Sequence, residues 1–370
     1  MSSQVLARKW RPKTFAELVG QDHVVKALSH ALDAQRLHHA YLFTGTRGVG
    51  KTTIARILAK SLNCEQGVSA TPCGVCATCQ EIDAGRFVDL LEIDAASNTG
   101  VDDMRQLIEN AEYMPTAGRY KVYLIDEVHM LSKNAFNALL KTLEEPPAHV
   151  LFILATTDPQ KVLPTVLSRC LQFNLKQMPP ADIVAHLQKI LTNENVTFDE
   201  EALHLIAKGA RGSMRDALSL TDQAIAYSAS NVSANAVKDM LGATDAAQIE
   251  AILHALIARD GVALVQVAEQ MAAGSNSFYD ATIELAQVLY RISLAQIVPD
   301  ALPDDWQLSK IVRELAPQMG ADEVQLYYSI VTQAREQLHL APDPQAGFTM
   351  MLLRLLAFAP EQFQADAVKK

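Results

Sequence analysis

The sequence lacks long hydrophobic runs, an N-terminal secretion signal and any excess of positive charge. Its longest apolar run, Val150 to Ala155, is far too short to cross a bilayer. The first ten residues contain no apolar stretch of the kind that directs secretion. Lys and Arg number 32 against 42 Asp and Glu, so the net charge is −10 and no overall positive field attracts nucleic acid. We therefore expect a cytoplasmic protein that does not bind membranes and that contacts DNA only through a local patch or within an assembly.

Aromatic residues and cysteines are also scarce. Aromatics make up 6% of the 370 positions, whereas hydrophobic residues as a whole reach 49%. This composition is typical of a soluble, helix-rich globular protein, and the length suggests two or three domains of about 100–200 residues each. Only five cysteines occur, and in a reducing compartment we expect no disulfides.

The first half of the sequence alternates short apolar runs with helical patterns. The runs predict strands at 40–43, 88–93, 121–125, 150–155 and 171–175. The patterns between them predict helices at 22–36, 50–62, 101–113 and 132–145. Short apolar strands that alternate with helices favour a parallel sheet covered on both faces, which is an α/β fold.

The pattern changes after the proline pair at 179–180. From there to the end we find no convincing strand, and helical patterns lie at 181–191, 200–210, 213–227, 234–241, 246–259, 263–273, 278–296, 323–338 and 348–357. The predicted organisation is an α/β domain over 1–178, a small helical domain over 179–242 and an all-helical domain over 243–370.

A glycine-rich segment between the first predicted strand and the next helix matches the phosphate-binding pattern G-x-x-x-x-G-K-[ST]. Its residues are Gly45, Thr46, Arg47, Gly48, Val49, Gly50, Lys51 and Thr52, with Thr53 next in the helix. The glycines let backbone N–H groups turn toward phosphates at a helix N-terminus. Lys51 is expected to reach the β- and γ-phosphates and Thr52 to place its hydroxyl on Mg²⁺. A chance match is the alternative, and the strand before the loop and the helix after it argue against it.

The third predicted strand runs into two acids, Asp126 and Glu127. In such a position Asp126 would hold the Mg²⁺ shell, and Glu127 would act as the general base toward the attacking water. An acidic pair alone is usually a solvated strand end, but a pair that follows a phosphate-binding loop favours the catalytic interpretation.

Four of the five cysteines are clustered, with the spacing C-x8-C-x2-C-x2-C. They are Cys64, Cys73, Cys76 and Cys79. Four thiolates at this spacing suit a closed, tetrahedral, structural Zn²⁺ site. Free buried thiols or a redox C-x-x-C pair are the alternatives. Cys170 stands apart and is expected in the core.

The order of the motifs is that of a known family. The opening stretch Leu6–Phe15 leads into Leu18–Gln21, and then come the glycine-rich segment, the cysteine quartet, Leu124–Glu127, Leu154–Thr157 and Ser168–Cys170. Over its whole length the chain resembles the AAA+ clamp-loader family, in particular the tau/gamma subunits of bacterial DNA polymerase III. The four-cysteine insert directly after the phosphate-loop helix is especially specific.

The resemblance implies an architecture and a function. The expected architecture is an AAA+ ATPase domain, a small helical lid and a helical collar that assembles a ring of five subunits, several of them copies of this chain. The expected function is that of an ATP-hydrolysing motor that opens the sliding clamp and loads it on primed DNA. The implied ligands are ATP, Mg²⁺ and a structural zinc. The implied partners are the other clamp-loader subunits, the sliding clamp and primer-template DNA.

The resemblance also assigns roles to single residues. Arg11 and Val19 match the segment on the adenine side of the nucleotide, Thr156 and Thr157 match sensor 1, Arg169 matches the arginine finger that enters a neighbour's site, and Arg215 matches sensor 2. Without the resemblance the last two would be taken as surface or salt-bridge arginines. The sequence 97–100 falls where related loaders contact DNA, but Asn98 and Gly100 are neutral here. Phosphate contacts would then come from Thr99, from backbone N–H groups or from Arg105.

Two other functions fit the same fold. One is a scaffold subunit that does not hydrolyse ATP, but such subunits lose residues equivalent to Lys51, Thr52, Asp126 or Glu127, which are all present here. The other is an AAA+ helicase-type motor, against which the cysteine insert and the long helical C-terminal part argue.

Overall fold

The computed structural model describes residues 5–97, 107–228, 231–241, 246–274, 277–302 and 308–358. The chain divides into two compact units, Met1–Val237 and Lys238–Lys370, and each is described by itself. None of the described helices is both long enough and apolar enough to span a bilayer.

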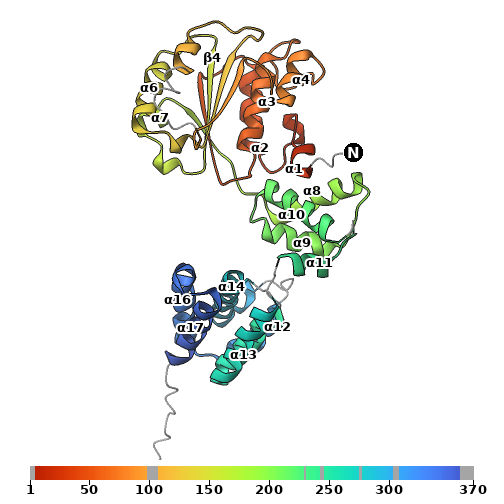
Figure 1. The fold of residues 1–370 in the computed structure, drawn as a ribbon, viewed down its shortest axis with the longest axis vertical. Coiled ribbons are helices and arrows are strands. Elements are labelled where there is room, and N and C mark those ends of the chain that lie inside the picture. The colour runs from red at the N-terminus through yellow and green to blue at the C-terminus, as the bar shows by residue number, and fades with distance from the viewer. Residues whose placement is uncertain are drawn as a thin grey trace, which may run out of the picture. The chain divides into compact units, whose positions relative to one another are not determined.

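A five-stranded parallel sheet forms the centre of the first unit (Figure 1). Its strands are β1 (Ala40–Thr44), β2 (Leu90–Asp94), β3 (Lys121–Asp126), β4 (Val150–Thr156) and β5 (Leu171–Asn174), in the order β2-β3-β4-β1-β5. In the register, Leu42 of β1 lies opposite Leu154 of β4, and Asp94 of β2 lies opposite Asp126 of β3. The carboxyl ends of these strands therefore meet at one edge, where parallel sheets place their ligand sites.

The sheet is covered by helices on both faces, because successive strand residues point to opposite sides. Val122 and Leu124 of β3 pack in one core with α2 (Asp22–Asp33) and α3 (Lys51–Asn63). Tyr123 and Ile125 pack in the other core with α6 (Lys133–Glu144) and α7 (Pro164–Leu167). Ser132 caps α6 by accepting from the N–H of Ala135. The parallel α/β sheet predicted from the sequence is thus present.

Several short elements were not predicted. They include α1 (Leu6–Lys9), α4 (Ala77–Ala84), α7, and the 3-10 helices Phe15–Glu17, Val128–Met130, Pro159–Lys161, Pro299–Ala301, Ala316–Gln318 and Leu338–Leu340. Residues 107–111 of the helix predicted at 101–113 are helical. The rest of its first part, with Arg105 and the neutral residues at 98–100, lies outside the described residues.

Four helices follow the sheet, and we refer to the first three as the lid. The lid consists of α8 (Pro180–Asn193), α9 (Glu200–Gly209) and α10 (Met214–Tyr227), and α11 (Ala234–Leu241) comes next. The expectation that no strand follows residue 180 was wrong, since Thr197–Phe198 and Asn231–Val232 pair in parallel. Two-residue strands are too short to leave an alternating pattern in the sequence.

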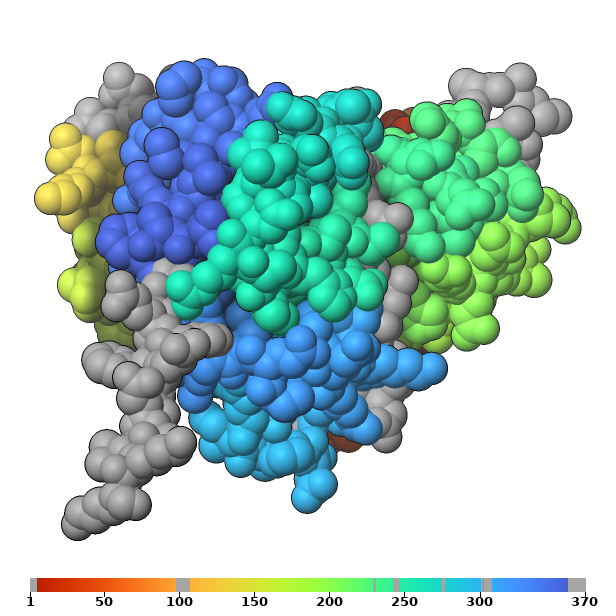
Figure 2. Space-filling model, turned by 90° about the horizontal axis from the view of Figure 1, so that it is seen from below, coloured from red at the N-terminus to blue at the C-terminus, as the bar shows by residue number. Residues whose placement is uncertain are grey.

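The second unit is all-helical in its described part. Its helices are α12 (Ala246–Ile257), α13 (Gly261–Ala273), α14 (Phe278–Ile297), α15 (Ser309–Leu315), α16 (Ala321–Gln337) and α17 (Pro344–Ala357). They share one core, in which Leu285, Tyr327 and Phe348 are fully buried. Figure 2 shows α13 (teal) beside α17 (dark blue) on the surface of this unit. The sequence did not predict α15.

Candidate functional site

The glycine-rich loop joins β1 to α3 and turns sharply at three glycines. Gly45, Gly48 and Gly50 have φ values of 143°, 79° and 107°, a region that side chains with a Cβ rarely adopt. At Gly48 a Cβ would also collide with the hydroxyl oxygen of Ser213 in the lid. The loop delivers its backbone to the N-terminus of α3, which is a favourable position for an anion.

Lys51 is the buried cation of this loop. Its side chain is held back against the loop, because Nζ donates to the carbonyl oxygens of Gly45 at 2.8 Å and Thr46 at 3.0 Å. Burial lowers the pKa of Lys51, while the nearby carboxylates of Glu127 and Asp126 raise it. An anionic ligand beside the ammonium would favour its charged form.

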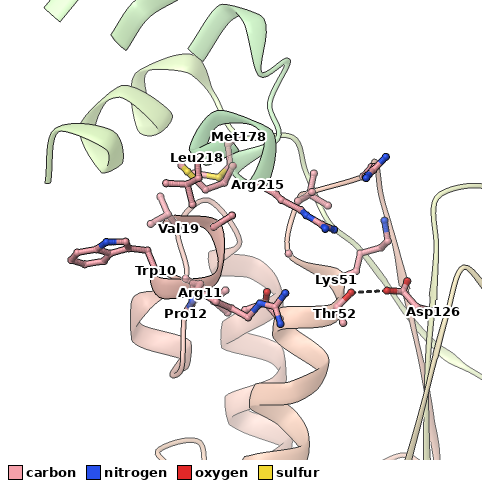
Figure 3. A pocket seen from close by; sticks show the side chains of 18 of the residues that line it. Trp10, Arg11, Pro12, Val19, Lys51, Thr52, Asp126, Met178, Arg215 and Leu218 are labelled. Atoms are coloured by element: carbon pink, nitrogen blue, oxygen red, sulfur yellow. Dashed lines mark hydrogen bonds between the residues drawn. The ribbon is translucent and has the colours of Figure 1, made fainter. Parts of the chain in front are cut away.

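Thr52 and Asp126 form a hydroxyl–carboxylate pair at the carboxyl edge of the sheet. Thr52 Oγ1 donates to Asp126 Oδ2 at 2.7 Å, and the pair comes from α3 and β3 (Figure 3). Oxygen ligands of this kind, few in number and completed by water and phosphate oxygens, suit Mg²⁺. The residues present therefore fit the ion that the loop pattern implies.

Glu127 adopts an unusual backbone conformation next to this pair. Its φ of 47° and ψ of 46° lie in the left-handed region, which is uncommon for a residue with a side chain and concentrates at functional sites. Its Oε2 accepts from the N–H of Thr157 at 3.1 Å and from the hydroxyl of Thr157 at 2.9 Å. His129 Nδ1 lies 3.4 Å from the same oxygen and 2.9 Å from Oγ1 of the buried Thr156.

A cavity of about 620 Å³ opens above the loop. Figure 3 shows Arg215 reaching from α10 toward the loop, while Trp10, Arg11, Pro12 and Val19 form the opposite wall. Burial lowers the pKa of Arg11, and the nearby guanidiniums of Arg56 and Arg215 add to this effect, against Glu92. A concave site with an anion-binding loop and two arginines suits a polyphosphate ligand.

Most of the residues predicted from the sequence come together around this cavity. Arg11, Val19, Arg47, Gly48, Val49, Gly50, Lys51, Thr52, Thr53, Asp126, Glu127 and Arg215 line it. Gly45 and Thr46 contact it through Lys51. Thr157 is hydrogen-bonded to Glu127, which lines the cavity, and Thr156 is hydrogen-bonded to His129.

Arg169 is not among the residues that line the cavity. Its guanidinium donates to Glu144 Oε1 at 2.5 Å and to the carbonyl oxygen of Thr165 at 2.7 Å, and its side chain is 32% exposed. Within one chain Arg169 thus lies apart from the phosphate loop.

Several lining residues were missed by the sequence analysis. They are Ala7, Trp10, Pro12, Glu17, Leu18, Glu92, Ile93, Asp94, Ala96, Leu124, Met178, His186, Met214 and Leu218. Glu92 and Asp94 could have been found, because they end a parallel strand next to β3. Two apolar lining residues carried no signal: Leu218 looks like an ordinary core position of a helical pattern, and Met178 lies in the irregular segment directly before α8.

The four clustered cysteines converge on one point. Their sulfur atoms all lie within 4.8 Å of one another, and Cys73 Sγ is 4.0 Å from Cys79 Sγ. Four Zn–S bonds of about 2.3 Å in a tetrahedron place the sulfurs about 3.8 Å apart, so the arrangement fits a zinc ion. Hydrogen bonds from the backbone of Val75 and Cys76 lower the pKa of Cys73 to about 6, which favours the thiolate that a metal requires.

The cysteine cluster is attached to the end of the phosphate-loop helix. Asn63 Oδ1 accepts from the N–H groups of Arg119 and Tyr120, each at 2.9 Å, directly before β3. The guanidinium of Arg119 donates to the carbonyl oxygen of Cys64 at 2.5 Å. Lys60 of α3, which is 1% exposed, pairs with Asp83 of α4. The cysteine insert therefore joins the C-terminal end of α3 to the start of β3.

Comparison with known proteins identifies related sequences along the whole chain. Residues 20–179 match a family model described as DNA polymerase III, delta subunit. Residues 182–230 match the ATPase lid domain of the DNA polymerase III clamp loader subunit, and residues 232–370 match domain III of DNA polymerase III subunits gamma and tau.

Individual relatives agree with these matches. The chain is 54% identical over 361 residues to DNA polymerase III subunit tau of Escherichia coli, covering 97% of this chain and 56% of the relative. It therefore spans about half the length of that tau relative. A DNA polymerase III subunit gamma of Buchnera aphidicola is 45% identical over 359 residues, covering 96% of this chain and 97% of the relative. Among solved structures, the RuvB branch migration motor of Thermotoga maritima covers 67% of this chain at 22% identity, with a TM-score of 0.49.

Proposed function

We propose, because the chain belongs to the gamma/tau family of DNA polymerase III subunits, that it is an ATP-hydrolysing motor of the replicative clamp loader. The observation that carries this proposal is the pairing of Thr52 with Asp126 at 2.7 Å beside Lys51, under a lid that brings Arg215 into the same cavity. A phosphate loop, a magnesium pair and a cationic lid are the parts that ATP hydrolysis requires.

Each group has a role in this reaction. The N–H groups of the loop and Lys51 bind and orient the β- and γ-phosphates, and Thr52 with Asp126 would hold Mg²⁺, which when bound neutralises charge on those phosphates. Glu127 takes a proton from the attacking water. Thr156 and Thr157 sense the state of the γ-phosphate. Arg215 couples the lid to it.

The adenine side of the nucleotide faces the wall that contains Arg11 and Val19. Met178 and Leu218 close this wall from the side of the lid. An apolar and partly cationic wall suits a flat base that stacks rather than one held by many hydrogen bonds.

Arg169 acts on the ATP site of the neighbouring subunit. The position of Arg169 outside the cavity of its own chain supports this role, and its side chain is 32% exposed. A cation supplied by a neighbour stabilises transition-state charge only in the assembled ring, so hydrolysis depends on assembly.

The remaining parts of the proposal concern the metal, the domains and the partners. The cysteine quartet holds a structural zinc. The ATPase domain covers residues 1–178, the lid 179–242 and the collar 243–370. The collar assembles a five-membered ring with other loader subunits, and the ring acts on the sliding clamp and on primer-template DNA in the cytoplasm.

Steady-state ATP hydrolysis tests this function. The chain is assembled with its candidate loader partners and assayed alone, with clamp, and with clamp plus primed DNA. Strong stimulation that requires both clamp and primed DNA is expected. Turnover that is independent of the clamp would favour a helicase-type motor, and an absence of turnover would favour a scaffold.

A further inference from the structure

The first described helix is fastened to the lid. The N–H of Leu6 donates to Asp222 Oδ2 of α10 at 2.8 Å, and the Leu6 side chain is buried. Lys9 Nζ and Trp10 Nε1 each lie 2.7 Å from an oxygen of the Glu194 carboxylate. Glu194 is the C-cap residue directly after α8. Two donors from neighbouring residues thus share one carboxylate of the lid.

The chain enters the nucleotide cavity directly after this attachment. Arg11 and Pro12 line the cavity, as does Trp10 itself (Figure 3). Further along, Gln21 fixes the segment to the sheet side, since its side chain donates to the carbonyl oxygen of Lys176 at 2.7 Å and accepts from the N–H of Lys176 at 3.2 Å. This wall of the cavity is therefore formed by the segment 6–21, which we call the strap. The strap is attached to the lid at its first end and to Lys176 at its second end.

The stability of α8 does not explain why an acid stands at position 194. A negative charge at the C-terminal end of a helix faces the negative end of the helix dipole, which is unfavourable. The ammonium of Lys9 and the indole N–H of Trp10 compensate the carboxylate, and the pKa of Glu194 is lowered by these hydrogen bonds. The charge at this position thus serves the contact with the strap.

We propose that Glu194 is a positioning residue for the nucleotide, which holds Trp10 and Lys9 so that Arg11 and Pro12 form the cavity wall before ATP binds. The inference rests on the proposed function, because it concerns the same ATP site. A wall that is loose in the free protein must be ordered when the ligand binds, and the ordering lowers the affinity. Glu194 stays outside the chemistry, since its contacts are with the strap.

Binding of the slowly hydrolysed analogue ATPγS with Mg²⁺ to the full chain, followed by calorimetry, tests this role. Removing a charge-assisted acceptor in Glu194→Ala is expected to raise the Kd about three- to tenfold. In the assembled loader, the change is expected in KM rather than in kcat. Glu194→Gln keeps an acceptor for Trp10, so its Kd is expected to lie between those of the parent and of Glu194→Ala. The matched control is Glu200→Ala, which removes an exposed acid on α9 of the same lid. This variant is expected to bind ATPγS with the Kd of the parent.

A second readout follows Trp10 directly. In a Trp306→Phe background Trp10 is the only tryptophan left, and Glu194→Ala is expected to shift its emission to longer wavelength without nucleotide, because the indole N–H is released to water. Trp10→Phe is expected to add little to the Kd of Glu194→Ala, since both changes break one contact. An unchanged Kd, or a raised Kd with unchanged Trp10 emission, overturns the inference. A parent chain that does not bind ATPγS contradicts the proposed function instead.

Discussion

The carboxylate of Glu127 accepts two hydrogen bonds from Thr157, one from its N–H at 3.1 Å and one from its hydroxyl at 2.9 Å. Glu127 directly follows β3 and Thr157 directly follows β4, so the contact joins the ends of two neighbouring strands. Both hydrogen bonds are accepted by the same oxygen, Oε2, and they hold the side chain of the proposed general base in one position at the edge of the cavity.

Replacing Glu127 by glutamine is expected to leave ATP binding intact and to reduce stimulated hydrolysis by about a hundredfold or more, because the base is lost while its size is kept. The measurement pairs ATPγS binding with turnover in the assembled loader. If the variant turned over at the parent rate, Glu127 would not be the base.

Replacing Arg169 by alanine is expected to preserve ATP binding to the isolated chain. Hydrolysis stimulated by clamp and primed DNA is expected to fall by roughly a thousandfold, the usual contribution of an arginine supplied by a neighbour. Glu144→Ala is the control, since it removes the partner that Arg169 has within its own chain and leaves the arginine in place. Unchanged DNA-stimulated turnover in Arg169→Ala would contradict the assignment.

The contact between Gly48 and Ser213 predicts a rescue. Gly48→Ala inserts a methyl group against the Ser213 hydroxyl, and overpacking of this kind costs about 1–3 kcal/mol, so ATP binding weakens at least several-fold. Adding Ser213→Gly is expected to restore part of the affinity, because glycine still serves as an N-cap at small cost. Gly50→Ala, which carries a similar backbone strain but has no protein atom within 4 Å of the added carbon, is not expected to be rescued.

Metal analysis of the purified chain is expected to find one zinc per molecule. Cys76→Ser is expected to lose the ion and several kcal/mol of stability, on the order of a structural zinc's contribution. Cys170→Ala is the control and is expected to retain the metal, because Cys170 lies outside the cluster and burial raises its pKa to about 12. Substantially less than one equivalent of zinc in the parent would count against the site.

The sequence predicted the centre of the fold well, because β1, β3 and β4 are buried on both faces and read as unbroken apolar runs. The edge strand β2 was harder to delimit: it was expected at 88–93 and lies at Leu90–Asp94, where its residues are half-buried or exposed. The helix α15 has seven residues, which make about two turns and leave little periodicity to detect.

The candidate site was predictable where its residues form contiguous motifs or match the motifs of the family. The loop that contains Lys51 is a contiguous motif, so its residue types and spacing suffice. The contacts between Trp10 and Glu194, and between Gly48 and Ser213, join residues far apart in the chain. Such pairs depend on how the lid packs against the rest of the chain, and a single sequence read alone contains no pattern that predicts them.

The helix α3 is pinned at both ends to the same strand. Thr52 donates to Asp126 at one end, and Asn63 donates to the carbonyl oxygen of Tyr120, directly before β3, at the other. The helical rise between Thr52 and Asn63 is about 17 Å. A helix that is held at both ends cannot tilt or slide on its own, so the fold itself fixes the spacing between Thr52 and Asp126. Changes in the site during turnover are then expected in parts outside this frame, such as Arg215 on the lid helix α10.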